Sequence, residues 1–131
     1  MIRGFKDGDI EKIDIQEEQL LEGDNDGFNS PNTVVFEEDG KVLVMMCPVY
    51  YDGGCIVAGL VSKECKNKST KLVRQTIRYL RDLKKNNDFV EISTQRGWLN
   101  AERLAWMLGF KPDRLLEKMY NGMDFNVWRL K

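Results

Sequence analysis

Cationic and hydroxyl side chains gather in the stretch LVSKECKNKSTKLVRQT, residues 60–76. Three lysines stand two or three positions apart, and a serine and a threonine follow them: Lys63, Lys66, Lys68, Ser69 and Thr70. Lysine ammonium groups bind phosphate as point charges, and the N-terminal N–H groups of a helix attract anions. The pattern indicates a phosphate-binding segment. The alternative is a solvated basic loop in which the serine or threonine only caps a helix.

The elements on either side of this segment support the phosphate hypothesis. CIVAGLV, residues 55–61, is an apolar run typical of a buried strand, and residues 69–85 repeat apolar positions at helical spacing. A strand that leads through a short loop into a helix is a common phosphate site, usually with glycines that let the backbone approach the ligand. This loop has no glycine.

The absence of histidine limits the chemistry of the chain. It excludes Ser-His-Asp and Cys-His catalysis and the common zinc sites, because all of these use imidazole. No metal is therefore expected, and no catalytic residue can be assigned from the sequence. The three cysteines, at 47, 55 and 65, follow no CxxC spacing, which indicates reduced thiols in a cytoplasmic protein.

Length and composition predict one domain over residues 1–131, with 42% hydrophobic and 31% charged residues. No apolar run approaches the roughly 20 residues of a membrane span, so no membrane association is expected. Charge is uneven, because residues 1–40 hold twelve acidic and three basic residues, a net charge of −9. The remaining residues carry a net charge of +8, which predicts a bipolar surface.

Helical spacing places five cations on one face of the segment 69–85: Lys71, Arg74, Arg78, Arg81 and Lys85. Such a face could contact nucleic acid or an acidic partner, or it could simply be solvated. No aromatic residues interleave with it, so nucleic acid is not the expected partner.

The remaining elements follow from local patterns. Residues 1–6 predict a strand. The segment 7–23 predicts a helix with Asp9 as N-cap and Gly23 at its end. The expected core residues of that helix are Ile10, Ile13, Leu20 and Leu21. Strands follow over 33–38, 41–51 and 55–61, with DG and DGG turns between them.

After the helix 69–85 we expect a strand over 89–94 and a helix over 101–108, capped by Asn100 and ended by Gly109. A hairpin of 114–120 and 123–130 closes on Asn-Gly. The order β-α-β-β-β-α-β-α-β-β predicts an α+β fold with a mixed sheet flanked by helices.

This order resembles the GNAT superfamily of acetyl-CoA-dependent N-acyltransferases over essentially the whole chain. The opening IRGFKDGDIEKI is similar to the first strand and helix of that family, and AERLAWMLGF is similar to its late helix. The final hairpin also fits. Short GNAT-like proteins of tailed phages are similar in size and in this ending.

The resemblance implies that acetyl-CoA lies between the fourth and fifth strands, with its phosphates at the loop. The implied cofactor-binding residues are Val61, Ser62, Lys63, Lys66, Lys68, Ser69 and Thr70. Backbone N–H groups around Val61 and Ser62 would stabilise the oxyanion. The family's loop glycines are absent here, and Ala105 and Trp98 stand where a tyrosine and an asparagine are common.

Two functions from different classes follow from the resemblance. The first is an N-acyltransferase whose amine substrate approaches the acidic N-terminal side. The alternative is a catalytically silent GNAT-like phage protein that acts in virion assembly or partner binding, in the host cytoplasm or in the virion. The acceptor, the partner surface and the oligomeric state are left open by the sequence.

Overall fold

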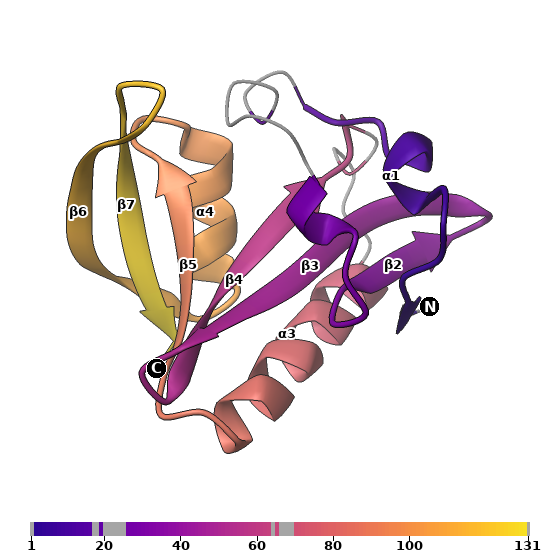
Figure 1. The fold of residues 1–131 in the computed structure, drawn as a ribbon, viewed down its shortest axis with the longest axis horizontal. Helices are drawn as coiled ribbons and strands as arrows, with labels where there is room; N and C mark the ends of the chain where they lie inside the picture. Colours follow the sequence, from indigo (N-terminus) through magenta and orange to yellow (C-terminus); the bar gives the residue numbers. More distant parts are fainter. Residues whose placement is uncertain (1, 17–18, 20–25, 64, 66–69, 131) are drawn as a thin grey trace. The chain divides into compact units, whose positions relative to one another are not determined.

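The computed structural model describes residues 2–16, 19, 26–63, 65 and 70–130. In chain order its elements are β1 (Ile2–Gly4), α1 (Asp9–Lys12), the 3-10 turn η1 (Asp26–Phe28), β2 (Val34–Glu38), β3 (Lys41–Tyr51), β4 (Gly54–Val61), α3 (Thr70–Lys85), β5 (Val90–Gln95), α4 (Leu99–Met107), β6 (Phe110–Tyr120) and β7 (Met123–Leu130) (Figure 1). The predicted order of strands and helices is confirmed, with η1 added. The predicted extent of the first helix, 7–23, is wrong, because α1 ends at Lys12, Ile13 is extended and Ile15 forms an antiparallel bridge with Ser62.

The strands form a mixed sheet in the order β1-β2-β3-β4-β5-β7-β6. β4 and β5 run parallel, whereas β1 with β2, β2 with β3, β5 with β7 and β6 with β7 run antiparallel. The predicted α+β class with a mixed sheet is thereby confirmed. By its internal contacts the chain divides into two compact units, residues 1–48 with 58–72 and residues 49–57 with 73–131.

The first unit encloses an apolar core beneath β2 and β3. Its buried side chains are Ile13, Phe28, Val35, Val42, Met45, Cys47 and Leu60. Ile13 was predicted to be a core residue, and Ile10 packs against the same cluster. Residues Leu20, Leu21 and Gly23 lie outside the described residues.

Asp9 is not the N-cap of the first helix, which corrects the prediction. Gly8 occupies the cap position, and Asp9 is the first helical residue, fully buried. Its carboxylate accepts two hydrogen bonds of 2.8 Å from the Arg3 guanidinium and one of 2.7 Å from the Lys6 N–H. The Asp9 carboxylate therefore pairs with Arg3 of β1 and does not cap the first helix in the way that the local pattern predicts.

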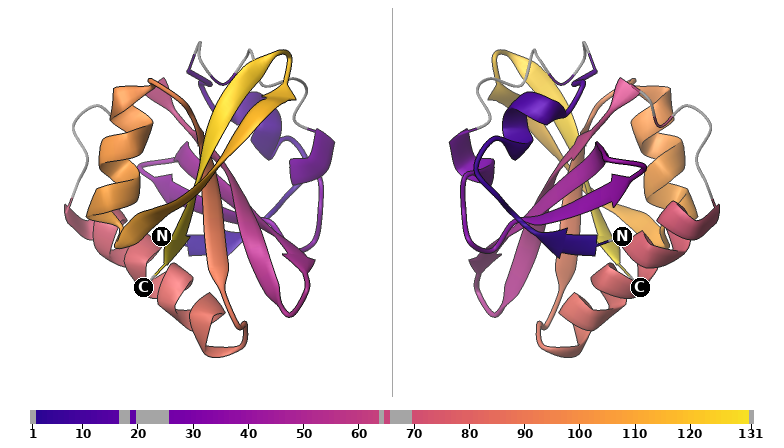
Figure 2. Two further views of the ribbon diagram at one scale, coloured as in Figure 1. Left: turned by 90° about the vertical axis from the view of Figure 1, so that its left-hand side faces the viewer. Right: turned by 90° about the vertical axis from the view of Figure 1, so that its right-hand side faces the viewer.

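The second unit joins β5, β7 and β6 into an antiparallel set, with α4 against β5 and β6 (Figures 1 and 2). Figure 2 shows β6 and β7 as a long twisted hairpin. Leu80 of α3 and Val90 of β5 are buried, and the five predicted cations of α3 are all exposed. The helical spacing read from the sequence therefore separates the two faces of α3 correctly.

Two boundaries in this unit differ from the predictions. Asn100 is the second residue of α4 instead of its cap, because Trp98 holds the N-cap position without a side-chain bond. β6 begins at Phe110 and not at residue 114, and the sheet register shifts between Pro112 and Arg114. A proline is tolerated at such an irregularity, since no ladder hydrogen bond is required from it there.

The three hairpin turns lie where the dipeptides predicted them. At the turn between β3 and β4, Asp52 and Gly53 both have positive φ, 48° and 85°. Two consecutive left-handed residues are what a two-residue type I′ turn requires. The turn brings Gly54 against the Phe89 ring, because a Cβ added at Gly54 would lie 2.6 Å from three ring atoms.

We predict that Gly54→Ala destabilises the protein by about 1–3 kcal/mol, because the new methyl group must displace the Phe89 ring. The free energy of unfolding from urea denaturation measures this. Gly4→Ala is the control, since Gly4 has no atom within 4 Å of an added Cβ. Equal stability of the two variants would contradict the close packing at Gly54.

Candidate functional site

β4 has different partners along its two edges. The N–H of Ser62, just beyond its end, donates to the Leu43 carbonyl of β3 at 2.8 Å. Because successive backbone N–H groups point to opposite edges of a strand, those of Val61 and Lys63 face away from β3. We call the atoms on that side, Gly59 O, Val61 N, Val61 O and Lys63 N, the outer edge of β4.

On the edge that faces away from β3, β4 pairs with β5 over only a short stretch. Its register with β5 consists of Cys55 opposite Val90 and Ile56 opposite Glu91. β4 itself continues to Val61. The outer edge thus begins after this pairing, and its polar backbone groups need other partners.

The side chain of Gln19 supplies two of those partners. Its Nε2 donates to the Gly59 carbonyl at 2.9 Å, and its Oε1 accepts from the Val61 N–H at 3.0 Å. Gln19 is 6% exposed. One side-chain amide therefore makes the donor and acceptor contacts that a neighbouring strand would make.

Residues 14–16 occupy the rest of the outer edge. The Lys63 N–H donates to the Asp14 carbonyl at 2.8 Å, and Ile15 forms an antiparallel bridge with Ser62. Gln16 Nε2 donates to the Val61 carbonyl at 3.3 Å. The chain after α1 thus covers the outer edge, through backbone at one end and glutamine amides at the other.

The predicted phosphate-binding residues are placed as follows. Lys63 is exposed, and Thr70 is exposed at the first position of α3. Val61 is half-buried and Ser62 is buried. Lys66, Lys68 and Ser69 lie outside the described residues. The assignment of this set to a cofactor stays a prediction.

The expectation of oxyanion donors is refined by these contacts. The Ser62 N–H belongs to the ladder with β3 and faces away from the outer edge. The Val61 N–H lies on the outer edge, where it donates to Gln19. Of the two predicted donors, only Val61 can reach a ligand without breaking the β3–β4 ladder.

Ala105 lies on the buried face of α4, the late helix of the sequence analysis. Trp98, at the N-cap position, is half-buried, and its indole N–H is buried without a hydrogen-bond partner among the described residues. Neither residue carries a hydroxyl or carboxylate that could transfer a proton.

A buried carboxylate with several charged partners lies on β5. Glu91 is fully buried and accepts hydrogen bonds from Arg114 at 2.7 and 3.2 Å and from Arg129 at 2.8 and 3.2 Å. The Tyr51 hydroxyl also donates to it. The pKa of Glu91 is lowered to about 2, and the hydrogen bond from Arg114 is the largest cause. Burial acts in the opposite direction and raises the pKa.

These contacts decide what Glu91 can do chemically. A general base works best when its pKa lies near the operating pH, and Glu91 is far below that range. Asp9 is also held as an anion, because its hydrogen bonds from Arg3 lower its pKa. Glu91 and Asp9 are thus structural anions, and neither is suited to take a proton from an amine.

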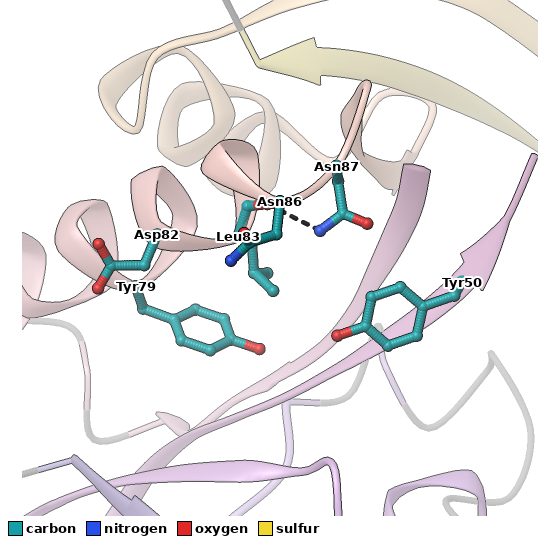
Figure 3. A pocket seen from close by; sticks show the side chains of 6 residues that line it. All are labelled: Tyr50, Tyr79, Asp82, Leu83, Asn86 and Asn87. Atoms are coloured by element: carbon teal, nitrogen blue, oxygen red, sulfur yellow. Dashed lines mark hydrogen bonds between the residues drawn. The ribbon is translucent and has the colours of Figure 1, made fainter. Parts of the chain in front are cut away.

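A hollow of about 470 Å³ lies at the C-terminal end of α3 in the second unit. Its lining residues are Tyr50, Tyr79, Asp82, Leu83, Asn86 and Asn87 (Figure 3). In Figure 3 the hydroxyl groups of Tyr50 and Tyr79 face each other across it. Of the predicted cofactor-binding residues that the structure describes, Val61, Ser62, Lys63 and Thr70, none lines this hollow.

Sequence reasoning missed Gln19, Gln16 and Glu91. A glutamate inside the apolar strand FVEIST was a visible signal, because a buried strand position that carries a charge requires a partner. No comparable signal marks the glutamines, which follow a short helix in a polar segment and contact residues 40 and 45 positions away.

Within the described part of the chain, no cluster of three His, Cys, Asp or Glu residues could hold a metal ion. In the same part, no helix has the length and apolarity needed to cross a bilayer.

Solved structures with the same arrangement of elements exist. Ard1 from Thermoplasma volcanium superimposes with a TM-score of 0.76 at 18% identity, over 100% of this chain and 97% of that one. The ribosomal-protein-S18-alanine N-acetyltransferase from Escherichia coli gives 0.70 at 14% identity, over 99% and 92% of the two chains.

A third structure was solved with a bound cofactor. A Bacillus subtilis acetyltransferase in complex with CoA gives a TM-score of 0.72 at 14% identity, over 99% of this chain and 97% of that one. No family model and no curated protein sequence matches the chain.

We predict that Glu91→Gln lowers the free energy of unfolding by about 2–3 kcal/mol at pH 7, because it removes the charge between two arginines. The folded-state pKa lies below the unfolded value near 4.5. The contribution is therefore complete above about pH 5 and lost as the pH falls toward 2.

Urea denaturation at several pH values measures the gap between wild type and Glu91→Gln. Asp113→Asn is the control, since Asp113 also contacts Arg114, at 2.7 Å, but is 36% exposed. A gap that stays constant from pH 6 to pH 3 would contradict the lowered pKa.

Proposed function

The chain has the GNAT fold, and from this premise we propose that it is an acyl-CoA-dependent N-acyltransferase that binds acetyl-CoA along the outer edge of β4. The observation that carries the proposal is the double contact of Gln19 with Gly59 and Val61. It means that this edge accommodates an amide with both of its hydrogen bonds made. The pantetheine arm of coenzyme A contains two secondary amides, of which one can accept from the Val61 N–H and the other can donate to the Gly59 carbonyl.

Positive charge near the end of β4 supports binding of the phosphate groups of the same ligand. Lys63 is exposed directly after the strand, and α3 begins at Thr70. The partial positive charge at the start of a 16-residue helix favours an anion there. Since the loop has no glycine, its lysine side chains and not a close backbone approach would supply the contact.

In the proposed reaction the amine nitrogen attacks the thioester carbonyl carbon, a C–N bond forms, and the C–S bond breaks with departure of the CoA thiolate. Once the pantetheine arm replaces Gln19 at the outer edge, one of its amides occupies the Val61 N–H, so the donor to the carbonyl oxygen, where negative charge develops, must be another group. The amine proton passes to water, because Glu91 and Asp9 are poor bases. Catalysis then rests mainly on positioning.

A specific observation favours a second function. The outer edge is already covered by residues 14–16 and 19, and the loop lacks the family's glycines. Both features suit a catalytically silent GNAT-fold protein, including one that acts in phage virion assembly or partner binding. Fold alone does not decide between the two functions.

We predict that acetyl-CoA binds, that binding weakens as salt rises from 50 to 300 mM, and that S-acetylpantetheine binds at least about tenfold more weakly. The physical reason is that lysine side chains hold the phosphates through screened charge. Isothermal titration calorimetry measures both ligands, and release of free thiol with a panel of primary amines tests turnover. Absence of heat and of any thermal shift at millimolar acetyl-CoA would contradict the proposal and support the silent alternative.

A further inference from the structure

Gln19 holds the outer edge of β4 as a ligand would. Its amide donates to Gly59 and accepts from Val61 with distances of 2.9 and 3.0 Å, and the side chain is buried. The pantetheine arm of an extended acyl-CoA offers the same donor and acceptor from two different secondary amides, because the N–H and C=O of a single trans amide point to opposite sides. Gln19 and this arm cannot use Gly59 O and Val61 N at the same time.

The contact is one that a ligand could replace. It depends on side-chain atoms of a residue outside β4, so its loss leaves the strand and its ladder with β3 intact. The two amides of an incoming pantetheine arm would satisfy the same two backbone groups, one through its N–H and the other through its carbonyl, so Gly59 O and Val61 N would not be left unpaired. What remains is the cost of moving Gln19 into solvent or into another contact.

We propose that Gln19 is an internal competitor that sets the affinity of the outer edge for acyl-CoA. This inference rests on the proposed function. The binding-competent state is the one in which the Gln19 amide has left Gly59 and Val61. The apparent dissociation constant is then the intrinsic one divided by the fraction of molecules in that state.

The neighbouring contacts indicate how far the competition extends. Ile13 ends α1 in an extended conformation, and the backbone of Asp14 stays bound to the Lys63 N–H. Release of the Gln19 side chain therefore does not require release of residues 13–15. The competition is local to one amide, which makes it testable with single substitutions.

The test compares acetyl-CoA binding to wild type, Gln19→Met and Gln19→Ala by isothermal titration calorimetry. Methionine keeps most of the buried volume but offers neither the amide donor nor the amide acceptor. Gln19→Met therefore avoids the cavity that could destabilise Gln19→Ala. We expect both variants to bind acetyl-CoA about tenfold more tightly, since two ordinary hydrogen bonds no longer oppose the ligand. Thr33→Val is the matched control. It removes another buried hydrogen bond of the first unit, from Thr33 Oγ1 to the Phe28 carbonyl at 2.8 Å, in which β4 takes no part.

A second measurement needs no ligand. Amide hydrogen exchange at Val61 should be faster in Gln19→Met than in wild type and unchanged in Thr33→Val, because the Val61 N–H donates to the Gln19 side chain. Unchanged exchange at Val61 in Gln19→Met would overturn the competitor, whatever the calorimetry gives.

The outcomes separate the two proposals. Binding to wild type with equal affinity in the Gln19 variants would overturn the competitor and leave the acyltransferase proposal standing. Binding to neither wild type nor variants would overturn the proposed function, and the competitor with it. Tighter binding in both variants but not in Thr33→Val is the result that supports both.

Discussion

The polar backbone along one edge of β4 must be paired, and much of the first unit is organised by that requirement. β4 pairs with β5 through Cys55 and Ile56 and then continues to Val61. Unpaired N–H and C=O groups are costly when they are shielded from water. The chain after α1 meets this demand with the Asp14 carbonyl and the amides of Gln16 and Gln19.

That solution links fold to function. A surface that must be satisfied, and that is satisfied by side-chain amides, is also a surface that an amide ligand can take over. The charge states of the buried carboxylates fit a site in which catalysis depends on positioning the reactants. The buried carboxylates Asp9 and Glu91 are each fixed as anions by arginines, which suits them for stability and not for proton transfer.

Much of the fold could be predicted from the sequence. The order of elements, the three turns and the two faces of α3 follow from local periodicity and turn chemistry, which act over a few residues. Asp9 was assigned wrongly because its ion pair with Arg3 forms in three dimensions, while an N-cap is a local pattern. Trp98 occupies the N-cap position of α4 without a side-chain hydrogen bond, and tryptophan is not among the residue types that predict an N-cap.

The candidate site was only partly predictable. The end of β4 and the start of α3 lie where the sequence predicted them, because the two elements follow closely in the sequence, while the role of the lysine-rich loop between them stays a prediction. Gln19 was missed, because its two partners lie 40 and 42 positions away and a glutamine in a polar segment has no distinguishing pattern. Pairing along a strand edge is a long-range property, which a single sequence does not display.

Acetyl-CoA, in the proposed site, takes the place of Gln19 on the outer edge of β4. A ¹⁵N–¹H NMR titration that follows the Val61 backbone amide and the Gln19 side-chain amide tests this replacement. We expect both signals to shift together and saturate with the same dissociation constant, while the Ser62 amide, held in the ladder with β3, moves little. Saturable binding that leaves the Val61 and Gln19 signals unchanged would contradict it.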